Sequence, residues 1–505
     1  MKKNKAIIIG SGVGGLATAI RLATDGFAVS VFEKNSYPGG KLSAFEKDGF
    51  LFDAGPSLFT CPNLIEEIFK YANEPIEDYF SYKKLINTCN YFFSDNTSIS
   101  ASSNIENFVA TLVSKHGEEK TKVENYLTQS KKIYQNTGNF FLQHSFHLFS
   151  SLFSKKIIAA VKGFKLKYIS KSLHQYNSSQ FNNPKTVQIF NRFATYNGSS
   201  PFLAPAMLSL ISHLEFNDGV FYPKGGMISI TNALYQLAVK KGVKFEFNKE
   251  VDEIVIENNT VKGILINKNF IQSSIVVSNG DVYFTYKSLL NNSKAANKIL
   301  KQERSSSAFI FYWGIDKQFP ELDLHNIFFA EDYKAEFESI FKTKSVYPDP
   351  TIYINITSKM EPGIQAPQGK ENWFVMINVP ASETIDWQKA KFEYRKFIIQ
   401  KINKTLHTNI EDLIETEEVL DPKLIESKTS SYLGSIYGTS SNSLFAAFLR
   451  HPNFSSKYKN LYFVGGSVHP GGGIPLCLHS AAITNKIIQT KITAGEFKIF
   501  KRRQE

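Results

Sequence analysis

Cysteine is scarce in this chain, with three residues among 505, and long uncharged apolar runs are missing. Cys61, Cys89 and Cys477 lie far apart without metal-ligand spacing, which argues against a disulfide framework or a zinc site. No apolar run reaches 18 residues, so no membrane span is predicted. The apolar run that follows the first lysines covers only residues 6–9, too short for a signal peptide. These absences predict a cytoplasmic protein.

Metal-binding patterns are also missing. None of the ten histidines occurs in an H-x-x-x-H or H-E-x-x-H arrangement, so no metal site is predicted. The length of 505 residues exceeds one usual core and predicts two or three structural units. Phenylalanine is abundant at 43 residues, which predicts a large aromatic lining or an apolar contact surface.

Acidic residues are absent from one long window. No Asp or Glu occurs between Asn125 and Leu214, whereas ten Lys and Arg residues fall there, so much of the net charge of +12 is concentrated in this region. The window is also rich in phenylalanine. An apolar stripe with helical spacing runs through it. Its members are Phe153, Ile157, Val161, Phe164 and Tyr168.

Two interpretations of this window remain open. It is either a core-packing helix with a solvated basic side, or a surface helix that dips Phe and Leu into acyl chains while Lys contacts anionic headgroups. We favour the second, because carboxylates are absent and phenylalanine is dense. No helix-turn-helix or RNA-binding signature accompanies the charge, so no nucleic-acid partner is expected.

The first 34 residues carry the strongest pattern. An apolar run at residues 6–9 precedes Gly10, Gly12 and Gly15, a helical pattern follows, and a second apolar run at 28–32 ends at Glu33. This order predicts a strand, a glycine-rich turn, a helix and a strand that together bind a dinucleotide. The helix N-terminus would face the pyrophosphate, and Glu33 would accept hydrogen bonds from a ribose diol. Nicotinamide and flavin both remain possible at this point.

The next motifs resemble one superfamily. A Gly-Gly-Lys step ends at Lys41, and the segment 52–57 reads Phe-Asp-Ala-Gly-Pro-Ser. Both resemble the FAD-dependent amine oxidases and carotenoid desaturases, where such a basic residue meets phosphate and such a turn lies beneath the isoalloxazine. Residues 242–254 resemble the adenine-side strand-turn-strand of these proteins, in which the residue at Val251 contacts adenine through its backbone.

The C-terminal motif completes the resemblance. Residues 465–475 read Gly-Gly-Ser-Val-His-Pro-Gly-Gly-Gly-Ile-Pro and resemble the flavin motif of carotenoid desaturases, where a last helix faces the flavin. Leu476, Cys477 and Leu478 depart from the small residues that are common there. His469 is interpreted as structural. We identify the chain as a member of the phytoene desaturase family of FAD-dependent oxidoreductases, closest to its 1-hydroxycarotenoid 3,4-desaturase branch.

The resemblance implies an α/β fold of three parts. A Rossmann-like FAD-binding domain of the amine oxidase/desaturase type would comprise residues 1–75, 225–290 and 425–505. A mixed α+β substrate-binding domain would comprise residues 76–120, 190–224 and 291–424. Independently of the resemblance, the strand-rich pattern at 309–314, 351–356 and 373–379 predicts a sheet that walls the substrate cavity. Residues 121–189 would form the basic, aromatic, helical membrane-contacting region.

The implied cofactor is FAD, and its predicted contacts come from four places in the chain. They are Gly10, Gly12, Gly14, Gly15, Glu33, Lys34, Gly40, Lys41, Leu42, Gly55, Pro56, Ser57, Val251, Gly466, Gly473, Ile474 and Pro475. His213 and Glu215 are the candidates for a catalytic base, with a buried structural histidine and a salt-bridged carboxylate as the alternatives.

The implied activity is desaturation of a hydroxylated carotenoid, of the 1′-hydroxy-γ-carotene type. The flavin would take a hydride from an allylic carbon while a proton leaves, inside a dry tunnel that aligns the bond. Oxygen or a membrane quinone would reoxidise the flavin, and the protein would lie peripherally on the inner face of the cytoplasmic membrane. Alternatives are a phytoene desaturase, a carotenoid ketolase, another flavin oxidase of lipid-like substrates, or a non-enzymatic lipid carrier.

Overall fold

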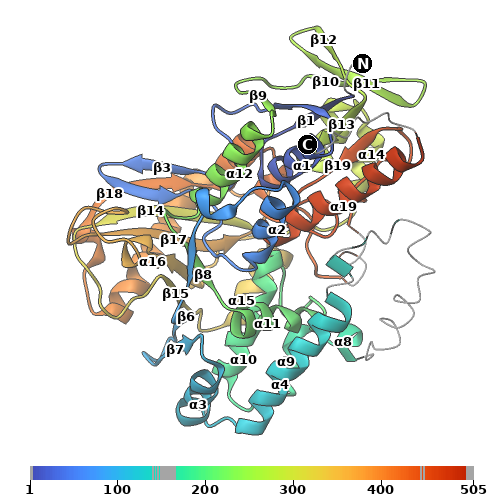
Figure 1. Cartoon of the computed structure of the whole chain (residues 1–505). Helices are drawn as coiled ribbons and strands as arrows, with labels where there is room; N and C mark the ends of the chain where they lie inside the picture. The colour runs from blue at the N-terminus through green and yellow to red at the C-terminus, as the bar shows by residue number, and fades with distance from the viewer. Residues whose placement is uncertain are drawn as a thin grey trace.

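The computed structural model describes residues 4–138, 167–443 and 450–495, with Phe141, Leu142, His144, His147 and Ala446. A five-stranded sheet and a seven-stranded sheet organise these residues, and a helical region lies below them in the view of Figure 1. Most of the basic, phenylalanine-rich stretch, residues 148–166, lies outside the described residues.

The five-stranded sheet is parallel throughout, in the order β19-β13-β1-β2-β9. Its strands are β1 (Lys5–Ile9), β2 (Ala28–Phe32), β9 (Lys244–Glu246), β13 (Ile275–Ser278) and β19 (Leu461–Phe463). The central strands are apolar on both faces because both faces are covered. Ile8 and Val277 pack with helices, whereas Ile7 and Val276 pack with residues of a second, antiparallel sheet.

Helices cover one face of the parallel sheet. They are α1 (Val13–Thr24), α2 (Asn63–Tyr71), α12 (Ile228–Lys240) and α19 (Ile474–Thr493), and α1 contacts the other three. The antiparallel sheet on the other face consists of β10 (Glu253–Glu257), β11 (Thr260–Ile266) and β12 (Asn269–Gln272). The predicted strand, turn, helix and strand of residues 6–32 are confirmed. The segment 242–254, predicted as strand-turn-strand, contains β9 and the start of β10. The two strands belong to different sheets, β9 to the parallel sheet and β10 to the antiparallel one.

Three distant parts of the chain build the parallel sheet. Its strands come from residues 5–32, 244–278 and 461–463, so each segment predicted for the cofactor domain contributes at least one strand. The residues at which the domains begin and end remain a prediction.

The seven-stranded sheet has the order β18-β14-β17-β16-β15-β6-β7. Its strands are β6 (Asn87–Phe92), β7 (Ser98–Ser102), β14 (Ser307–Ile315), β15 (His325–Phe328), β16 (Ile352–Asn355), β17 (Glu371–Val379) and β18 (Ile414–Leu420). Alternation along β14 sends Phe309, Phe311 and Trp313 toward α16 (Trp387–Leu406). Ala308 and Ile310, on the opposite face, line the large cavity described below. Phe309, Phe311 and Trp313 therefore build a core, whereas Tyr312 lines the cavity together with Ala308 and Ile310.

The helical region is also packed by aromatic rings. It contains α3 (Ile105–His116), α4 (Lys120–Ile133), α8 (Lys167–Ser170), α9 (Leu173–Ser178), α10 (Pro184–Asn191) and α11 (Ile211–His213). Phe108 and Phe216 stack with ring centroids 4.4 Å apart. Tyr168, the last member of the predicted apolar stripe, is buried against Tyr176, and the other four members lie outside the described residues.

Shorter elements complete the fold. They are β3 (Ala44–Lys47), β4 (Phe50–Asp53), β5 (Tyr82–Lys84), β8 (Phe221–Pro223), α13 (Val282–Phe284), α14 (Ser293–Ile299), α15 (Tyr333–Glu338) and α17 (Pro422–Thr429). Among the helices of the described ranges, none combines the length and the apolar character that crossing a bilayer requires.

Candidate functional site

A cavity of about 1080 Å³ lies between the parallel sheet, the seven-stranded sheet and the helical region. Its walls include the glycine-rich turn after β1, the ends of β2 and β13, and the β14 and β17 face opposite α16. The site therefore lies at the carboxyl ends of parallel strands, where open α/β sheets bind their ligands.

The first glycine turn packs too closely for side chains. A Cβ on Gly15 would lie 2.3 Å from the Gly10 carbonyl oxygen, so helix α1 packs on β1 only if this residue is glycine. A Cβ on Gly12 would lie 2.7 Å from Nδ2 of Asn279, at the end of β13. The backbone at Gly12 and Gly14 consequently forms the cavity wall itself.

Glu33 anchors this turn. One carboxylate oxygen accepts hydrogen bonds from the Ser11 amide and hydroxyl, both at 2.8 Å, and the other accepts from the Asn35 amide at 2.9 Å and side chain at 3.0 Å. Glu33 is 5% exposed and lines the cavity. A ribose hydroxyl can reach this carboxylate when the Ser11 hydroxyl rotates away, since about four acceptor positions are available on a carboxylate.

Lys34 also lines the cavity, but its amino group is used within the protein. It donates to the Ser427 carbonyl oxygen at 2.6 Å and to Oγ of Ser430 at 2.9 Å. These bonds tie the end of β2 to the end of α17. The placement favours a structural role for the Lys34 side chain beside the cofactor site.

The second glycine loop lies against the first. The Gly39 amide donates to the Ser11 carbonyl oxygen at 2.9 Å, and Gly40 and Lys41 line the cavity next to Leu42. The Lys41 amino group donates to the Ile436 carbonyl oxygen at 3.1 Å. Burial lowers the pKa of Lys41 to about 8, and nearby Asp281 partly offsets this effect.

The turn that follows β4 places three more predicted residues in the cavity wall. They are Gly55, Pro56 and Ser57. A Cβ on Gly55 would lie 1.9 Å from the Lys41 carbonyl oxygen, so the two predicted loops are packed together by backbone contact. The Ser57 hydroxyl donates to the Tyr353 hydroxyl oxygen at 3.0 Å and thereby links this turn to the seven-stranded sheet.

The C-terminal glycine loop closes the same cavity. Gly466, Gly473, Ile474 and Pro475 all line it, and α19 begins at Ile474 with proline in its first turn. Proline is tolerated there because the first amides of a helix have no intrahelical acceptor. Of the residues that depart from the family pattern, Leu476 and Cys477 line the cavity and Leu478 is buried in the core.

These features fit a dinucleotide with a flavin. Two helix N-termini and the partly buried Lys41 suit phosphate oxygens, Glu33 suits a ribose diol, and Val251 provides a buried apolar contact in the wall. Within the ranges that the structure describes, no cluster of His, Cys, Asp and Glu side chains is arranged to hold a metal ion.

The two candidate bases differ in position. Glu215 lines the cavity, but its carboxylate forms a buried ion pair with Arg192 and accepts a hydrogen bond from the Tyr196 hydroxyl. Burial opposes the charge on Arg192, but Glu215 together with Tyr91 and Tyr196 outweighs burial and raises the pKa of the guanidinium. The paired carboxylate therefore gives no support to Glu215 as a free catalytic base.

His213 is not among the cavity-lining residues. Its Nε2 lies 3.6 Å from Oδ1 of Asp218, and its ring packs against Tyr134 with centroids 5.0 Å apart. Burial lowers the pKa of this histidine. Its environment favours the alternative of a buried structural histidine, and the role of His213 as a base stays a prediction.

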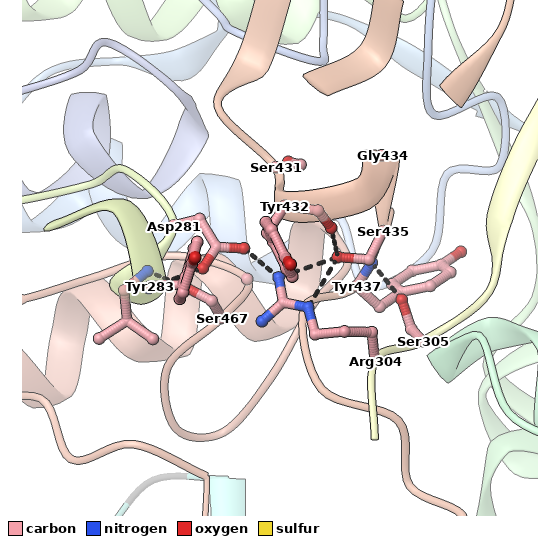
Figure 2. Close-up of polar contacts among 12 residues, drawn as sticks. Asp281, Tyr283, Arg304, Ser305, Ser431, Tyr432, Gly434, Ser435, Tyr437 and Ser467 are labelled. Carbon is pink, nitrogen blue, oxygen red and sulfur yellow. Dashed lines mark hydrogen bonds and ion pairs between the residues drawn. The ribbon is translucent and has the colours of Figure 1, made fainter. Parts of the chain in front are cut away.

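Sequence reasoning missed a buried polar network beside the cavity (Figure 2). Asp281 pairs with Arg304, and Nε of Arg304 also donates to Oγ of Ser435 at 3.1 Å. The Val282 amide donates to Oγ of Ser467 at 3.0 Å. The residues of this network lie far apart in the sequence. The Asn-Gly-Asp motif at residues 279–281 is a local pattern that could have indicated it.

Comparisons with known proteins agree with this geometry. A family model described as flavin containing amine oxidoreductase matches residues 13–486. The chain is 51% identical to a 1-hydroxycarotenoid 3,4-desaturase of Flavobacterium sp. (strain P99-3), over 96% of this chain and 99% of the relative. It is 33% identical to a 4,4'-diaponeurosporene oxygenase of Staphylococcus aureus (strain MSSA476), over 97% of this chain and 98% of the relative.

Two solved structures share the fold. An oxidoreductase from Methanosarcina mazei matches with a TM-score of 0.63 at 16% identity, covering 96% of this chain and 100% of that one. A putrescine oxidase bound to putrescine matches with a TM-score of 0.63 at 12% identity, covering 98% and 99%. At these identities the likeness concerns the fold alone.

Proposed function

This chain belongs to the flavin-containing amine oxidoreductase family, and from that membership we propose that it is an FAD-dependent carotenoid desaturase. The proposed reaction introduces a carbon–carbon double bond into a hydroxylated carotenoid, at the 3,4 position of a 1-hydroxylated end. The observation that carries the proposal is the 51% identity to a 1-hydroxycarotenoid 3,4-desaturase over 96% of the chain.

The cofactor is FAD, and the chain has the α/β FAD-binding fold of its family. When bound, FAD supplies the acceptor for the hydride that leaves the substrate. The two glycine loops and Lys41 would hold its phosphates, and Glu33 its ribose. The C-terminal loop from Gly466 to Pro475 would meet the flavin end. We also propose that the FAD-binding domain comprises residues 1–75, 225–290 and 425–505, and that the substrate-binding domain comprises residues 76–120, 190–224 and 291–424.

The cavity provides a dry, apolar channel for the polyene. Ile310, Phe374 and Met376 line it from the seven-stranded sheet, and Leu208 and Ile211 line it from the helical region. Removing a long hydrocarbon from water is favourable in such a site, and rigid walls hold one bond in place for reaction. Because Glu215 is paired with Arg192, we do not assign the departing proton to it.

The membrane is the proposed source of the substrate. Phe141 and Leu142, within the predicted membrane-contacting region, line the cavity, so this region contributes to the channel wall. The basic and phenylalanine-rich residues that follow suit an anionic lipid surface. We therefore propose a cytoplasmic protein that lies peripherally on the inner face of the membrane, with oxygen or a quinone as terminal acceptor.

The test is anaerobic incubation of the FAD-loaded protein with a 1-hydroxylated carotenoid. A desaturase shifts the polyene absorption to the red, bleaches the flavin and lowers the substrate mass by two hydrogens. A carotenoid oxygenase, which the 33% identity to the diaponeurosporene oxygenase makes the second candidate, adds oxygen when air is admitted. Binding without flavin bleaching would indicate a carrier and would contradict the desaturase assignment.

A further inference from the structure

His325 is a buried histidine in the wall of the substrate cavity that none of the site predictions included. It is the first residue of β15, it is 3% exposed, and it lines the cavity from the seven-stranded sheet. Arg192 lies near enough to influence its charge, and burial with this neighbour lowers the pKa of His325 to about 3. The ring is therefore neutral at physiological pH and carries one N–H.

The surrounding bonds determine which ring nitrogen carries that hydrogen. Nδ2 of Asn355 donates to the Leu324 carbonyl oxygen at 3.1 Å, and a carbonyl only accepts, so the amide nitrogen is fixed on that side. The same Nδ2 lies 3.2 Å from Nδ1 of His325. An amide nitrogen donates and does not accept, so Nδ1 is the acceptor and the hydrogen lies on Nε2.

Tyr353 reinforces this tautomer. Its hydroxyl lies 2.8 Å from Nδ1 of His325 and 3.0 Å from Oγ of Ser57. The Ser57 hydroxyl donates to the Tyr353 oxygen. The hydroxyl hydrogen of Tyr353 is therefore available to donate to Nδ1 of His325. Two donors from adjacent strand β16 thus hold the ring with Nε2–H as its only remaining polar group.

Nε2 of His325 is buried, and it has no hydrogen-bond partner in the described part of the chain. A buried donor without an acceptor is unfavourable, and natural cores contain few of them. His325 lines the cavity, so a molecule bound there can supply the missing acceptor once a small movement of the ring opens the enclosed Nε2 to it. The cavity wall on β14 and β17 is mostly hydrocarbon or aromatic. Arg192 and Glu215 also line the cavity, but they are paired with each other, whereas Nε2 of His325 has no such partner among the described residues.

We propose that Nε2–H of His325 donates a hydrogen bond to the hydroxyl oxygen of the substrate and so selects polyenes with an oxygenated end. This inference rests on the proposed desaturase function and deepens it. Ser57, which belongs to the turn predicted beneath the flavin, is joined to His325 through the single Tyr353 hydroxyl. A hydroxyl held there lies near the reacting end, as required when only two carbon–carbon bonds separate the hydroxylated carbon from the bond to be oxidised.

The experiment compares two substrates in the FAD-loaded protein, a 1-hydroxylated carotenoid and its deoxy analogue. His325→Phe keeps a flat ring and removes both nitrogens. We expect the Phe variant to lower kcat/KM for the hydroxylated substrate by roughly 10- to 100-fold, which corresponds to the loss of one buried hydrogen bond. We expect kcat/KM for the deoxy analogue to change by less than about threefold. His325→Gln retains an amide donor and is expected to recover part of the preference.

A binding measurement accompanies turnover. The dissociation constant of a 1-hydroxylated polyene that already carries the 3,4 double bond is measured by its absorption change, and His325→Phe should weaken it by a similar factor. His116→Leu is the matched control, because His116 is a hydrogen-bonded histidine outside the cavity. His325→Leu replaces the Phe variant if the larger ring prevents folding.

Equal losses for both substrates would show that His325 only supports the fold, and an unchanged preference would show that another group binds the hydroxyl. Either result overturns the inference while wild-type desaturation still stands. If the wild type desaturates neither substrate, the proposed function fails. The binding measurement then still decides whether His325 distinguishes hydroxylated from deoxy polyenes.

Discussion

Arg304 and Asp281 form a buried ion pair that joins the parallel sheet to the seven-stranded sheet. Asp281 follows β13 of the parallel sheet, Arg304 precedes β14 of the seven-stranded sheet, and both are less than 10% exposed. Figure 2 shows the pair among Ser435, Tyr432 and Ser467, which come from later loops. The Arg304 guanidinium is therefore one of the contacts that fix the position of the cofactor side of the site relative to the substrate side.

Replacing Arg304 by Ala should destabilise the protein strongly. The change leaves the Asp281 carboxylate buried without its cation, at a cost of about 3–5 kcal/mol. The measurement is the midpoint of thermal unfolding, with and without FAD. Lys120→Ala, which breaks an exposed ion pair at 3.8 Å with Glu124, is the control and should cost less than about 1 kcal/mol. A similar midpoint for both variants would contradict the role given to Arg304.

Lys41 should make FAD binding depend on pH. Its pKa is lowered to about 8 by burial, so the ligand-free protein holds a charged lysine below pH 8 and a neutral one above it. If the ammonium form holds a phosphate, the dissociation constant for FAD is constant below pH 8 and rises above it, by up to about tenfold per pH unit. Fluorescence titrations between pH 6.5 and 10 measure this.

Lys41→Arg provides the comparison, because a guanidinium keeps its charge through this range. Its FAD affinity should stay level up to pH 10, and Lys41→Met should bind FAD more weakly with no dependence on pH. The same slope in wild type and in the Arg variant would assign the titration to another group.

Gly15→Ala should prevent normal loading with FAD. The added Cβ would lie 2.3 Å from the Gly10 carbonyl oxygen, so α1 must move away from β1. We expect a loss of about 1–3 kcal/mol and a low ratio of flavin to protein absorbance after reconstitution. Gly117→Ala is the control, since Gly117 has positive φ but open space around it. The Gly117→Ala variant should lose about 1–2 kcal/mol of folding stability and should bind FAD normally.

Glu215→Gln distinguishes a structural carboxylate from a catalytic base. Loss of this charge leaves Arg192 buried and unpaired, so we expect a fall in the thermal midpoint that corresponds to about 3–5 kcal/mol. The double variant Arg192→Met/Glu215→Leu should regain most of that stability. A Gln variant with a normal midpoint and turnover reduced by about 10²-fold or more would instead establish Glu215 as a base.

Reversal of four charges tests the membrane proposal. Substitution of Lys155, Lys156, Lys162 and Lys165 by Glu should abolish most pelleting with anionic liposomes, since each basic residue near such a surface contributes about 1 kcal/mol. The matched control reverses four exposed lysines elsewhere. These are Lys268, Lys294, Lys298 and Lys301. Equal pelleting of both variants would leave net charge, rather than this region, as the cause.

Local sequence patterns predicted the cofactor-binding half of the site. The β1-turn-α1-β2 unit and the loops at Lys41, Ser57 and Gly473 are contiguous motifs whose backbone geometry is encoded by neighbouring residues, and all of them reach one cavity. Hydrophobic alternation likewise predicted β14, β16 and β17 to within two residues at each end.

Partners across the fold were not predictable in the same way. Arg192 with Glu215 and His325 with Tyr353 are separated by 23 and 28 residues and meet only through tertiary packing. Isolated polar residues have no periodicity that reveals such a pairing. The abundance of phenylalanine was ambiguous for a related reason, because the same side chain suits a cavity wall or a core, and the phenylalanine rings on β14 pack in the core.

The construction of the parallel sheet from three segments has a consequence for synthesis of the protein. Strand β19, at residues 461–463, is the last to leave the ribosome and the only described strand that covers the outer edge of β13. Until then β13 presents open hydrogen-bonding groups and apolar faces, which favour aggregation. FAD can be enclosed only after α19 and the loop that precedes it have been synthesised, so the cofactor is captured after all three segments of the sheet are present.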